Sequence, residues 1–212
     1  MVNNNNIGKN TVLWRYMDFD ALLEILTQKR VIFTRIDQFD DKFECMSVNK
    51  NADLLLVEKL RKTTNILSWH KNRYESEAMW RLYSNYYKNA VAIKTTVNTL
   101  HEIFDDTFSI EPVQYIDYKE TEPDENMLYL YKRKSFEYEN EIRIIHSAKK
   151  EAPYRLNVPL DEEKLHKLIK IIYISPYARF DFNIVVKSIL DKYGFDKTQI
   201  EYSNEFMGGL RY

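Results

Sequence analysis

Glycine is the residue whose scarcity most limits the folds open to this chain. Only four glycines occur in 212 residues: Gly8, Gly194, Gly208 and Gly209. Neither the G-x-G-x-x-G turn of dinucleotide-binding Rossmann domains nor the G-x-x-x-x-G-K-[ST] phosphate loop can be written with them, because both need glycines at fixed short spacings. The sequence therefore excludes both folds in their usual forms.

Composition excludes several classes of site. Cys45 is the only cysteine, so the chain has no internal disulfide and no multi-cysteine zinc cluster. The four histidines lie far apart and lack the spacing of metal ligands. The net charge is -1, from 31 basic and 32 acidic side chains, which excludes a global basic field for nucleic acid but leaves a local basic patch open.

The ends and the apolar runs indicate no membrane partner. The first residues, Met1 to Asn6, have neither the basic region nor the apolar region of a secretory signal. The longest apolar runs, such as residues 171–174, are far too short to span a bilayer. We therefore expect a cytoplasmic protein whose residues 1–10 form a flexible N-terminus.

Hydrophobic periodicity predicts an α+β chain. Helices and strands follow one another irregularly, without a βαβα rhythm, and no repeat or linker divides the sequence. We predict one domain over residues 11–212 with about seven strands. Its elements include strands over residues 11–16, 65–70, 109–118 and 141–146, and helices over residues 76–87 and 127–134.

Two glutamates at the edge of a predicted strand are the first candidates for chemistry. Glu139 and Glu141 would share a face if the strand began by Glu139. A carboxylate there can stabilise an oxocarbenium-like centre, bind a ribose hydroxyl or accept a proton. The structural alternative is a solvated acidic turn in which Glu141 pairs with Arg143 on the same face.

Arginine and serine on two other predicted strands are weaker candidates. Arg15 lies between Trp14 and Tyr16, so alternation places it on the opposite face from both rings, where it can bind phosphate or simply face solvent. Ser68 and His70 share a face of the next internal strand. Their side chains run parallel and do not favour a nucleophile–base pair, so Ser68 is expected to hydrogen-bond a ligand or to order Glu141.

Aromatic residues at helical spacing and an acidic loop have plain structural interpretations. Met79, Trp80 and Tyr83 follow the spacing of a core face, although Tyr83 can also stack on a flat ligand such as nicotinamide. The segment from residue 33 to residue 44 is acidic and aromatic. It lacks the spacing of an EF-hand, and a capped turn is the preferred interpretation.

Several segments occur in a fixed order over residues 12–203: Leu13-Trp14-Arg15-Tyr16 with residues 22–26, Ile32-Phe33-Thr34 with residues 39–44, residues 75–83, and residues 134–144. Together they resemble a bacterial family, domain-of-unknown-function family 2971. An Asn-Asp-Pro turn usual in that family is replaced here by Asp40-Asp41-Lys42.

The same order resembles the DNA-modifying members of the ADP-ribosyltransferase superfamily. That resemblance implies a split, twisted mixed β-sheet flanked by helices, and NAD as substrate without a metal. Arg15, Ser68 and Glu141 match the class that uses Arg, Ser and Glu. The resemblance to this class implies that Arg15 holds NAD, that Ser68 supports the ribose pocket, and that Glu141 stabilises the transition state. Tyr83 would stack near nicotinamide, Glu139 would orient or deprotonate the acceptor, and Arg35 would contact phosphate or the target.

The predicted function is transfer of ADP-ribose from NAD to a macromolecule, either nucleic acid or protein. The resemblance implies a toxin or phage-defence effector, with an antitoxin or regulator as a further partner. Two alternatives stay open: NAD hydrolysis with water as acceptor, and a non-catalytic binding module on the same fold. In an enzyme the four residues Arg15, Ser68, Tyr83 and Glu141 would line one cleft, whereas a module can leave Glu141 locked to Arg143.

Overall fold

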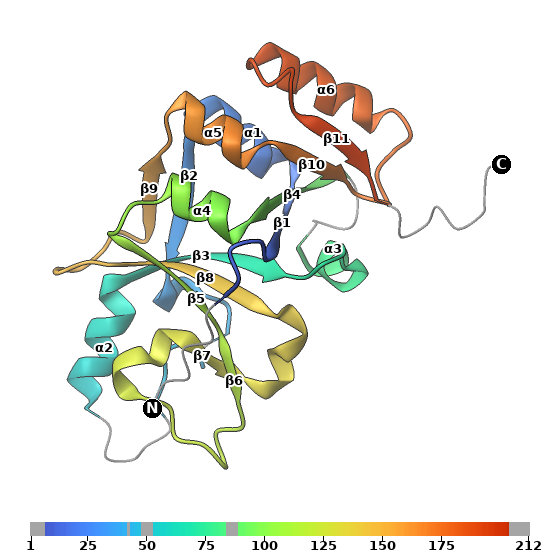
Figure 1. Cartoon of the computed structure of the whole chain (residues 1–212). Helices are drawn as coiled ribbons and strands as arrows, with labels where there is room; N and C mark the ends of the chain where they lie inside the picture. The colour runs from blue at the N-terminus through green and yellow to red at the C-terminus, as the bar shows by residue number, and fades with distance from the viewer. Residues whose placement is uncertain (1–6, 42, 48–52, 84–88, 204–212) are drawn as a thin grey trace. The chain divides into compact units, whose positions relative to one another are not determined.

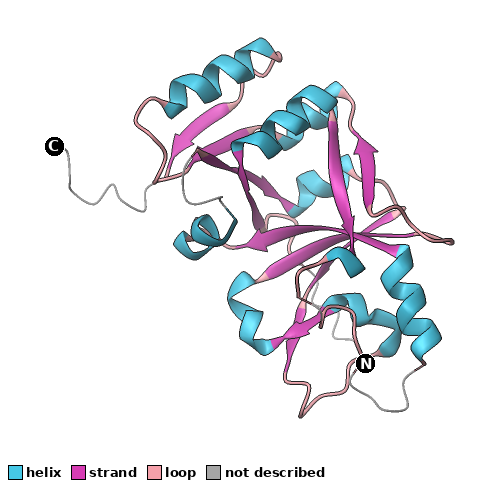
Figure 2. Cartoon of the chain, turned by 180° about the vertical axis from the view of Figure 1, so that it is seen from behind, coloured by secondary structure: helices cyan, strands magenta, loops and turns pink. Residues whose placement is uncertain are grey.

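The computed structural model describes residues 7–41, 43–47, 53–83 and 89–203 (Figures 1 and 2). The chain forms two compact units, each assembled from segments far apart in sequence. Unit 1 comprises Met1–Ile7, Ile32–Lys71 and Phe104–Val158, and unit 2 comprises Gly8–Val31, Asn72–Ile103 and Pro159–Tyr212. The α+β class, with helices flanking a mixed sheet, is confirmed. That residues 11–212 act as one domain stays a prediction.

Unit 1 is built on an antiparallel sheet with β3 and β8 at its centre. The ladder between these two strands places Ser68 opposite Arg143 and His70 opposite Glu141. These four side chains lie on one face of the ladder. On the opposite face, alternate residues such as Ile144 are buried. The strands run in the order β2 (Arg30–Arg35), β3 (Thr64–Lys71), β8 (Glu141–Ser147) and β5 (Phe108–Pro112), with β9 (Arg155–Pro159) beside β2.

A second sheet of unit 1 holds two short parallel strands, β6 (Gln114–Ile116) and β7 (Tyr131–Arg133). The predicted strand over 109–118 is therefore broken at Val113, because β5 pairs with β8 whereas β6 pairs with β7. The Val113 backbone N–H still donates to the Glu141 carbonyl of β8 at 3.0 Å, directly after the Pro112–Ile142 pair, and the chain pairs with β7 from Gln114 onward. The register sets Tyr115 beside Lys132.

The helix predicted over 127–134 is wrong. A 3-10 segment, η3 (Glu125–Leu130), occupies its first half, and Met127 has a non-helical φ of -125°. From Tyr131 onward the backbone extends to pair with β6, so tertiary pairing overrides the local helical preference. A further 3-10 segment, η4 (Lys134–Glu139), leads into β8.

The core of unit 1 gathers around the 3-10 segment η1 (Ile36–Gln38) and the helix α2 (Leu54–Thr63). Each large aliphatic side chain buried there contributes roughly 1.5–3 kcal/mol to folding. In Figure 1, α2 lies beside the segment that contains η3. The buried members of this cluster are Ile36, Cys45, Val57, Ile66, Leu128, Leu130 and Ile145.

Unit 2 carries the mixed sheet. Its strands run in the order β1 (Val12–Asp18), β4 (Ala90–Thr96), β10 (Ile171–Ile174) and β11 (Gln199–Tyr202). The first two pairings are antiparallel, whereas β10 and β11 are parallel and are joined by the crossover helix α6 (Phe182–Lys192) (Figure 1). The other helices are α1 (Phe19–Gln28), α3 (Glu77–Tyr83), α4 (Val97–Ile103) and α5 (Glu162–Leu168).

Helix ends in unit 2 follow the capping signals of the sequence. The Asp18 carboxylate accepts a hydrogen bond from the Ala21 N–H at 2.9 Å and caps α1. Helix α6 ends at Lys192, and Gly194 follows just past its C-cap Tyr193 with a φ of 83° that suits a residue without a Cβ. There the Phe195 N–H donates back to the Leu190 carbonyl at 2.8 Å, which closes the last turn.

The aromatic stripe on α3 is core, as its spacing favours. Met79 and Trp80 are buried against Trp14 and Tyr16 of β1. Tyr83, at the end of α3, is 49% exposed. Helix α3 covers residues 77–83, and the rest of the helix predicted over 76–87 lies outside the described residues. None of the helices in the described parts of the chain is long and apolar enough to cross a membrane.

Candidate active site

Glu141 opens strand β8 and is held through both carboxylate oxygens. Ser68 Oγ, on the neighbouring strand β3, donates a hydrogen bond to Glu141 Oε1 at 2.5 Å. Arg143, two residues further along β8, donates from Nε to Oε1 at 2.9 Å and from Nη2 to Oε2 at 3.1 Å. The carboxylate is therefore fixed in orientation as well as in position.

Arg143 is the central cation of this cluster, and its side chain has no exposed surface. Besides Glu141, it donates to Glu44 Oε2 at 2.9 Å and to the Tyr129 carbonyl at 2.6 Å. A buried guanidinium with these partners keeps its charge, and the two carboxylates raise the pKa of Arg143 against the effect of burial.

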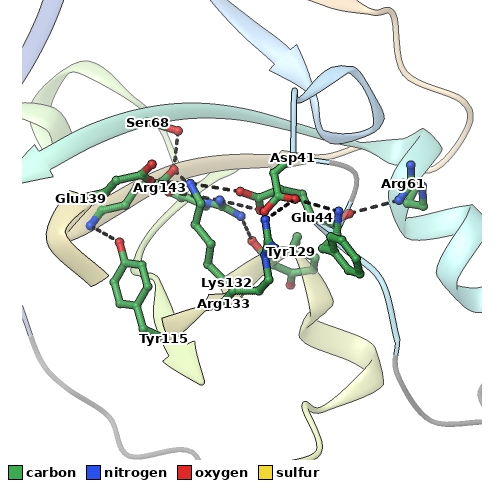
Figure 3. A network of polar contacts seen from close by, with 12 residues as sticks. Asp41, Glu44, Arg61, Ser68, Tyr115, Tyr129, Lys132, Arg133, Glu139 and Arg143 are labelled. Atoms are coloured by element: carbon green, nitrogen blue, oxygen red, sulfur yellow. Dashed lines mark hydrogen bonds and ion pairs between the residues drawn. The ribbon is translucent and has the colours of Figure 1, made fainter. Parts of the chain in front are cut away.

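Lys132 brings a second cation to the same point from strand β7. Its ammonium contacts Glu44 Oε1 at 3.1 Å and Glu141 Oε2 at 3.4 Å, and it forms an ion pair with Glu139 Oε2 (Figure 3). Glu44 is itself anchored through its backbone, because Arg61 donates to its carbonyl at 3.1 Å. Three carboxylates thus face two cations in a buried cluster.

Glu139 and Glu141 converge although they do not lie on one strand. Strand β8 begins at Glu141, where the predicted strand over residues 141–146 also begins, so Glu139 lies before the strand and the condition for a shared strand face is not met. Asn140 separates the two glutamates with a left-handed backbone, φ 40° and ψ 55°, which asparagine tolerates better than most residues. This turn directs both carboxylates toward Lys132.

Two hydrogen bonds fix the backbone around the glutamates. The Glu141 N–H donates to the Tyr115 hydroxyl at 2.8 Å. The Glu139 carbonyl lies 2.6 Å from His70 Nδ1. Ser68 contacts Glu141, whereas His70 contacts the backbone of Glu139. Ser68 and His70 are therefore not arranged as nucleophile and base, in agreement with the sequence-based interpretation.

The two glutamates have opposite protonation behaviour. Burial alone would raise the pKa of Glu141, but Arg143, Lys132 and Ser68 together lower it to about 2. Burial raises the pKa of Glu139, and the hydrogen bond and charge of Lys132 offset that effect only in part. A pair whose environments separate its pKa values in this way can assign one carboxylate to electrostatics and the other to proton transfer.

Arg15 and Tyr83 lie near one another in unit 2. Arg15 is half-buried on β1 between the buried Trp14 and Tyr16. Burial lowers the pKa of Arg15 to about 10, and the charge interaction with Tyr83 opposes that shift. Of the residues predicted for the site, the structure thus groups Ser68, Glu139 and Glu141 in unit 1 and Arg15 with Tyr83 in unit 2. That the four residues Arg15, Ser68, Tyr83 and Glu141 line one cleft stays a prediction.

Arg35 makes buried contacts that connect two segments of the fold. Its guanidinium, almost completely buried, pairs with Asp37 at 2.9 Å and with Glu151 at 3.0 Å. It also donates to the Ala152 carbonyl at 2.7 Å and lies over the Tyr154 ring at 4.2 Å. These contacts tie β2 to the segment before β9, and a phosphate or target contact for Arg35 stays a prediction.

Sequence reasoning missed Lys132 and Glu44. Lys132 lies in the segment predicted as a helix, directly after the apolar run Leu128–Tyr131, and that prediction gives no reason to place its ammonium in a buried cluster. Glu44 was assigned to a capped turn. The turn exists, since the Phe43 N–H donates to Asp41 at 3.1 Å, but Glu44 continues from it into the cluster. Within the described residues no group of His, Cys, Asp and Glu side chains could hold a metal ion.

Comparisons with known proteins identify only remote similarity. No family model matches the chain, so the resemblance to domain-of-unknown-function family 2971 is not confirmed, and no curated protein matches. The solved structures that match include Thermus sp. 2.9 DarT in complex with carba-NAD+ and the same protein in complex with NAD+. Each has a TM-score of 0.45 and 10% identity, over 92% of this chain and 96% of that chain. At this distance the function has to be inferred from this chain's own residues.

Proposed function

We propose that this chain is an NAD-dependent ADP-ribosyltransferase that modifies a macromolecule. The observation that carries the proposal is the setting of Glu141, an ionised carboxylate oriented by Ser68 and placed two residues after a second carboxylate with a raised pKa. A fixed anion of this kind stabilises positive charge that develops on a ribose during bond cleavage.

In the proposed reaction, Glu141 and Glu139 have different roles. The C1′–N bond of NAD breaks, and its electron pair leaves with nicotinamide, which departs neutral. Glu141 stabilises the oxocarbenium-like sugar through its negative charge, and a nucleophile of the acceptor forms the new bond to C1′. Glu139 accepts the proton that the nucleophile loses, so atoms and charge balance.

Arg15 and Tyr83 supply the binding functions in this proposal. A guanidinium that burial has desolvated binds a phosphate oxygen more strongly than one in water. Tyr83 presents a half-exposed ring that can stack on nicotinamide. A role as a toxin or phage-defence effector in the cytoplasm, with an antitoxin or regulator as partner, belongs to the same proposal.

One observation favours a second candidate, the non-catalytic binding module. Arg143 occupies both oxygens of Glu141, which is the locked arrangement expected of a module. Under this alternative the cluster stabilises unit 1, and NAD is not turned over. NAD hydrolysis is the third candidate, since water can replace the acceptor nucleophile in the same reaction.

The deciding experiment measures nicotinamide release and transfer of labelled ADP-ribose from NAD in cell lysate. Wild type is compared with Glu141→Gln and with the control Glu137→Gln, which alters an exposed glutamate of η4. A transferase labels a macromolecule, and the label disappears only in Glu141→Gln. Nicotinamide release without label identifies a hydrolase. If wild type is silent and calorimetry detects no NAD binding, the enzyme proposal is wrong and the binding module replaces it.

A further inference from the structure

We propose that Lys132 is a positioning residue that holds Glu139 in its ionised form, ready to accept a proton. This role deepens the proposed transfer reaction and rests on it. Lys132 does not follow from the order of motifs in the sequence, because it comes from a separate two-stranded sheet and reaches the glutamates only through the fold.

The geometry around Lys132 is that of a fixed cation. The ammonium has three N–H donors, and three carboxylates surround it, those of Glu44, Glu139 and Glu141. The Phe136 ring centroid lies 5.0 Å from Nζ, within the range of a cation–π interaction. The side chain is 10% exposed, so little solvent screens these interactions.

Glu139 depends on Lys132 more than the other two carboxylates do. Glu141 and Glu44 each pair with Arg143 as well as with Lys132. Among the ion pairs of the described residues, Glu139 has Lys132 as its cationic partner. Loss of the lysine charge would therefore leave Glu139 buried beside two anions.

Several other groups face Glu139 and must be considered in its titration. Burial, Glu141 and Glu44 favour the protonated form, whereas the hydrogen bond and charge of Lys132 favour the ionised form. The charged and titratable groups of the cluster that contains Glu139 are Lys132 on β7, Glu141 and Arg143 on β8, Glu44 after η1, His70 on β3 and Tyr115 on β6.

The consequence for the transfer reaction concerns one proton. A protonated Glu139 cannot take the proton of the acceptor nucleophile as the C1′ bond forms and nicotinamide leaves. By lowering the pKa of the Glu139 carboxyl, Lys132 favours the ionised base without touching the substrate. An opposite charge at this range lowers a carboxyl pKa by about 1–3 units.

The test is a carboxyl titration by NMR, which needs no activity. Protein labelled with 13C at the glutamate carboxyls is titrated as wild type, Lys132→Met, Lys132→Arg and the control Lys134→Met, which removes an exposed neighbouring charge. Glu139→Gln assigns the signal. We expect the pKa of Glu139 to rise by about one unit or more in Lys132→Met, to return toward wild type in Lys132→Arg, and to stay unchanged in Lys134→Met. An unchanged pKa of Glu139 in folded Lys132→Met overturns the proposal.

A reciprocal measurement keeps the proposal testable if Lys132→Met does not fold. Coupling between two titrating groups is equal in both directions, so Glu139→Gln should lower the pKa of Lys132, read from its ammonium 15N signal. An unchanged Lys132 pKa overturns the proposal. In an active enzyme, the acid limb of the kcat/KM profile moves to higher pH in Lys132→Met. If the chain lacks transferase activity, the NMR result still decides whether Lys132 controls Glu139, and only the catalytic consequence falls.

Discussion

Arg143, two residues after Glu141 on strand β8, donates two hydrogen bonds to the Glu141 carboxylate. Its Nε lies 2.9 Å from Oε1 and its Nη2 lies 3.1 Å from Oε2. Both side chains are buried, with 0% of the Arg143 and 6% of the Glu141 side chain exposed. The pair therefore stabilises unit 1 only while it is complete, because a lone buried charge costs more than the pair contributes.

Arg143→Met should lower the free energy of unfolding by about 3–5 kcal/mol, since it leaves Glu141 and Glu44 with less compensating charge. Urea denaturation measures the loss. Arg179→Met is the control, because Arg179 is mostly exposed and its substitution should change stability by less than about 0.5 kcal/mol. Equal midpoints for wild type and Arg143→Met would show that the cluster does not stabilise the fold.

The depressed pKa of Glu141 predicts a specific dependence of stability on pH. The ionised form is favoured in the folded chain, so its contribution is complete above the ordinary value of 4.5 and is lost as pH falls to about 2. The shift corresponds to about 3 kcal/mol. We expect Glu141→Gln to be less stable than wild type by about this amount at pH 6, and the gap to close toward pH 2. Glu137→Gln should follow wild type throughout, and a constant gap would contradict the assignment.

Ser68→Ala removes the hydroxyl that orients Glu141. A hydrogen bond to a charged group contributes about 1.5–3 kcal/mol, so we expect a loss of stability in this range and a higher pKa for Glu141. In an active transferase, kcat should fall by about tenfold or more, because the anion loses its orientation. The exposed Ser109, on strand β5, provides the matched control Ser109→Ala. If both serine variants behave alike, the Ser68 hydroxyl has no special role.

Tyr115→Phe tests the contact that fixes the start of β8. The substitution leaves the Glu141 N–H without its acceptor, at a cost of about 1–3 kcal/mol. Hydrogen exchange at the Glu141 amide should accelerate in this variant and not in Tyr138→Phe, whose ring is 52% exposed. Unchanged protection of that amide would mean that the ladder, and not the hydroxyl, holds the strand end.

Arg15→Met tests the NAD-binding half of the proposed function. Loss of a charge-assisted contact to phosphate should weaken NAD binding by about 10- to 100-fold, measured by calorimetry. Arg30→Met removes a partly exposed arginine of the same unit, and it should leave the affinity unchanged. Equal affinities for the two variants would remove Arg15 from the proposed site.

The local signals of the sequence predict most elements of the fold. Asp18 and Gly194 mark helix ends where the structure has them, and the alternation around Ser68 predicts β3 correctly. The prediction fails between residues 109 and 134, where two strands pair in a second sheet. Pairing between segments distant in sequence decides that region, and periodicity within a window carries no information about it.

The candidate site, like the fold, is predicted only in part from the sequence. The sequence shows that Glu139 and Glu141 lie two residues apart. That their carboxylates converge depends on the left-handed turn at Asn140 and on Lys132, which comes from another sheet. Glu44 lies 97 positions before Glu141 in the numbering of the chain, and only the fold brings it to Arg143. Residue types and short spacings were therefore sufficient to find the carboxylates and insufficient to find what holds them.

The ladder between β3 and β8 also limits how this chain can change during evolution. It pairs residues 64–70 with residues 141–147 without interruption. Deleting one residue inside β8 would turn every following side chain to the opposite face, bringing isoleucines to the places of charged groups. Substitutions can accumulate on either strand, but gaps cannot. Homologous chains that retain the site are expected to vary in length only outside these two segments, which an alignment of related sequences would reveal.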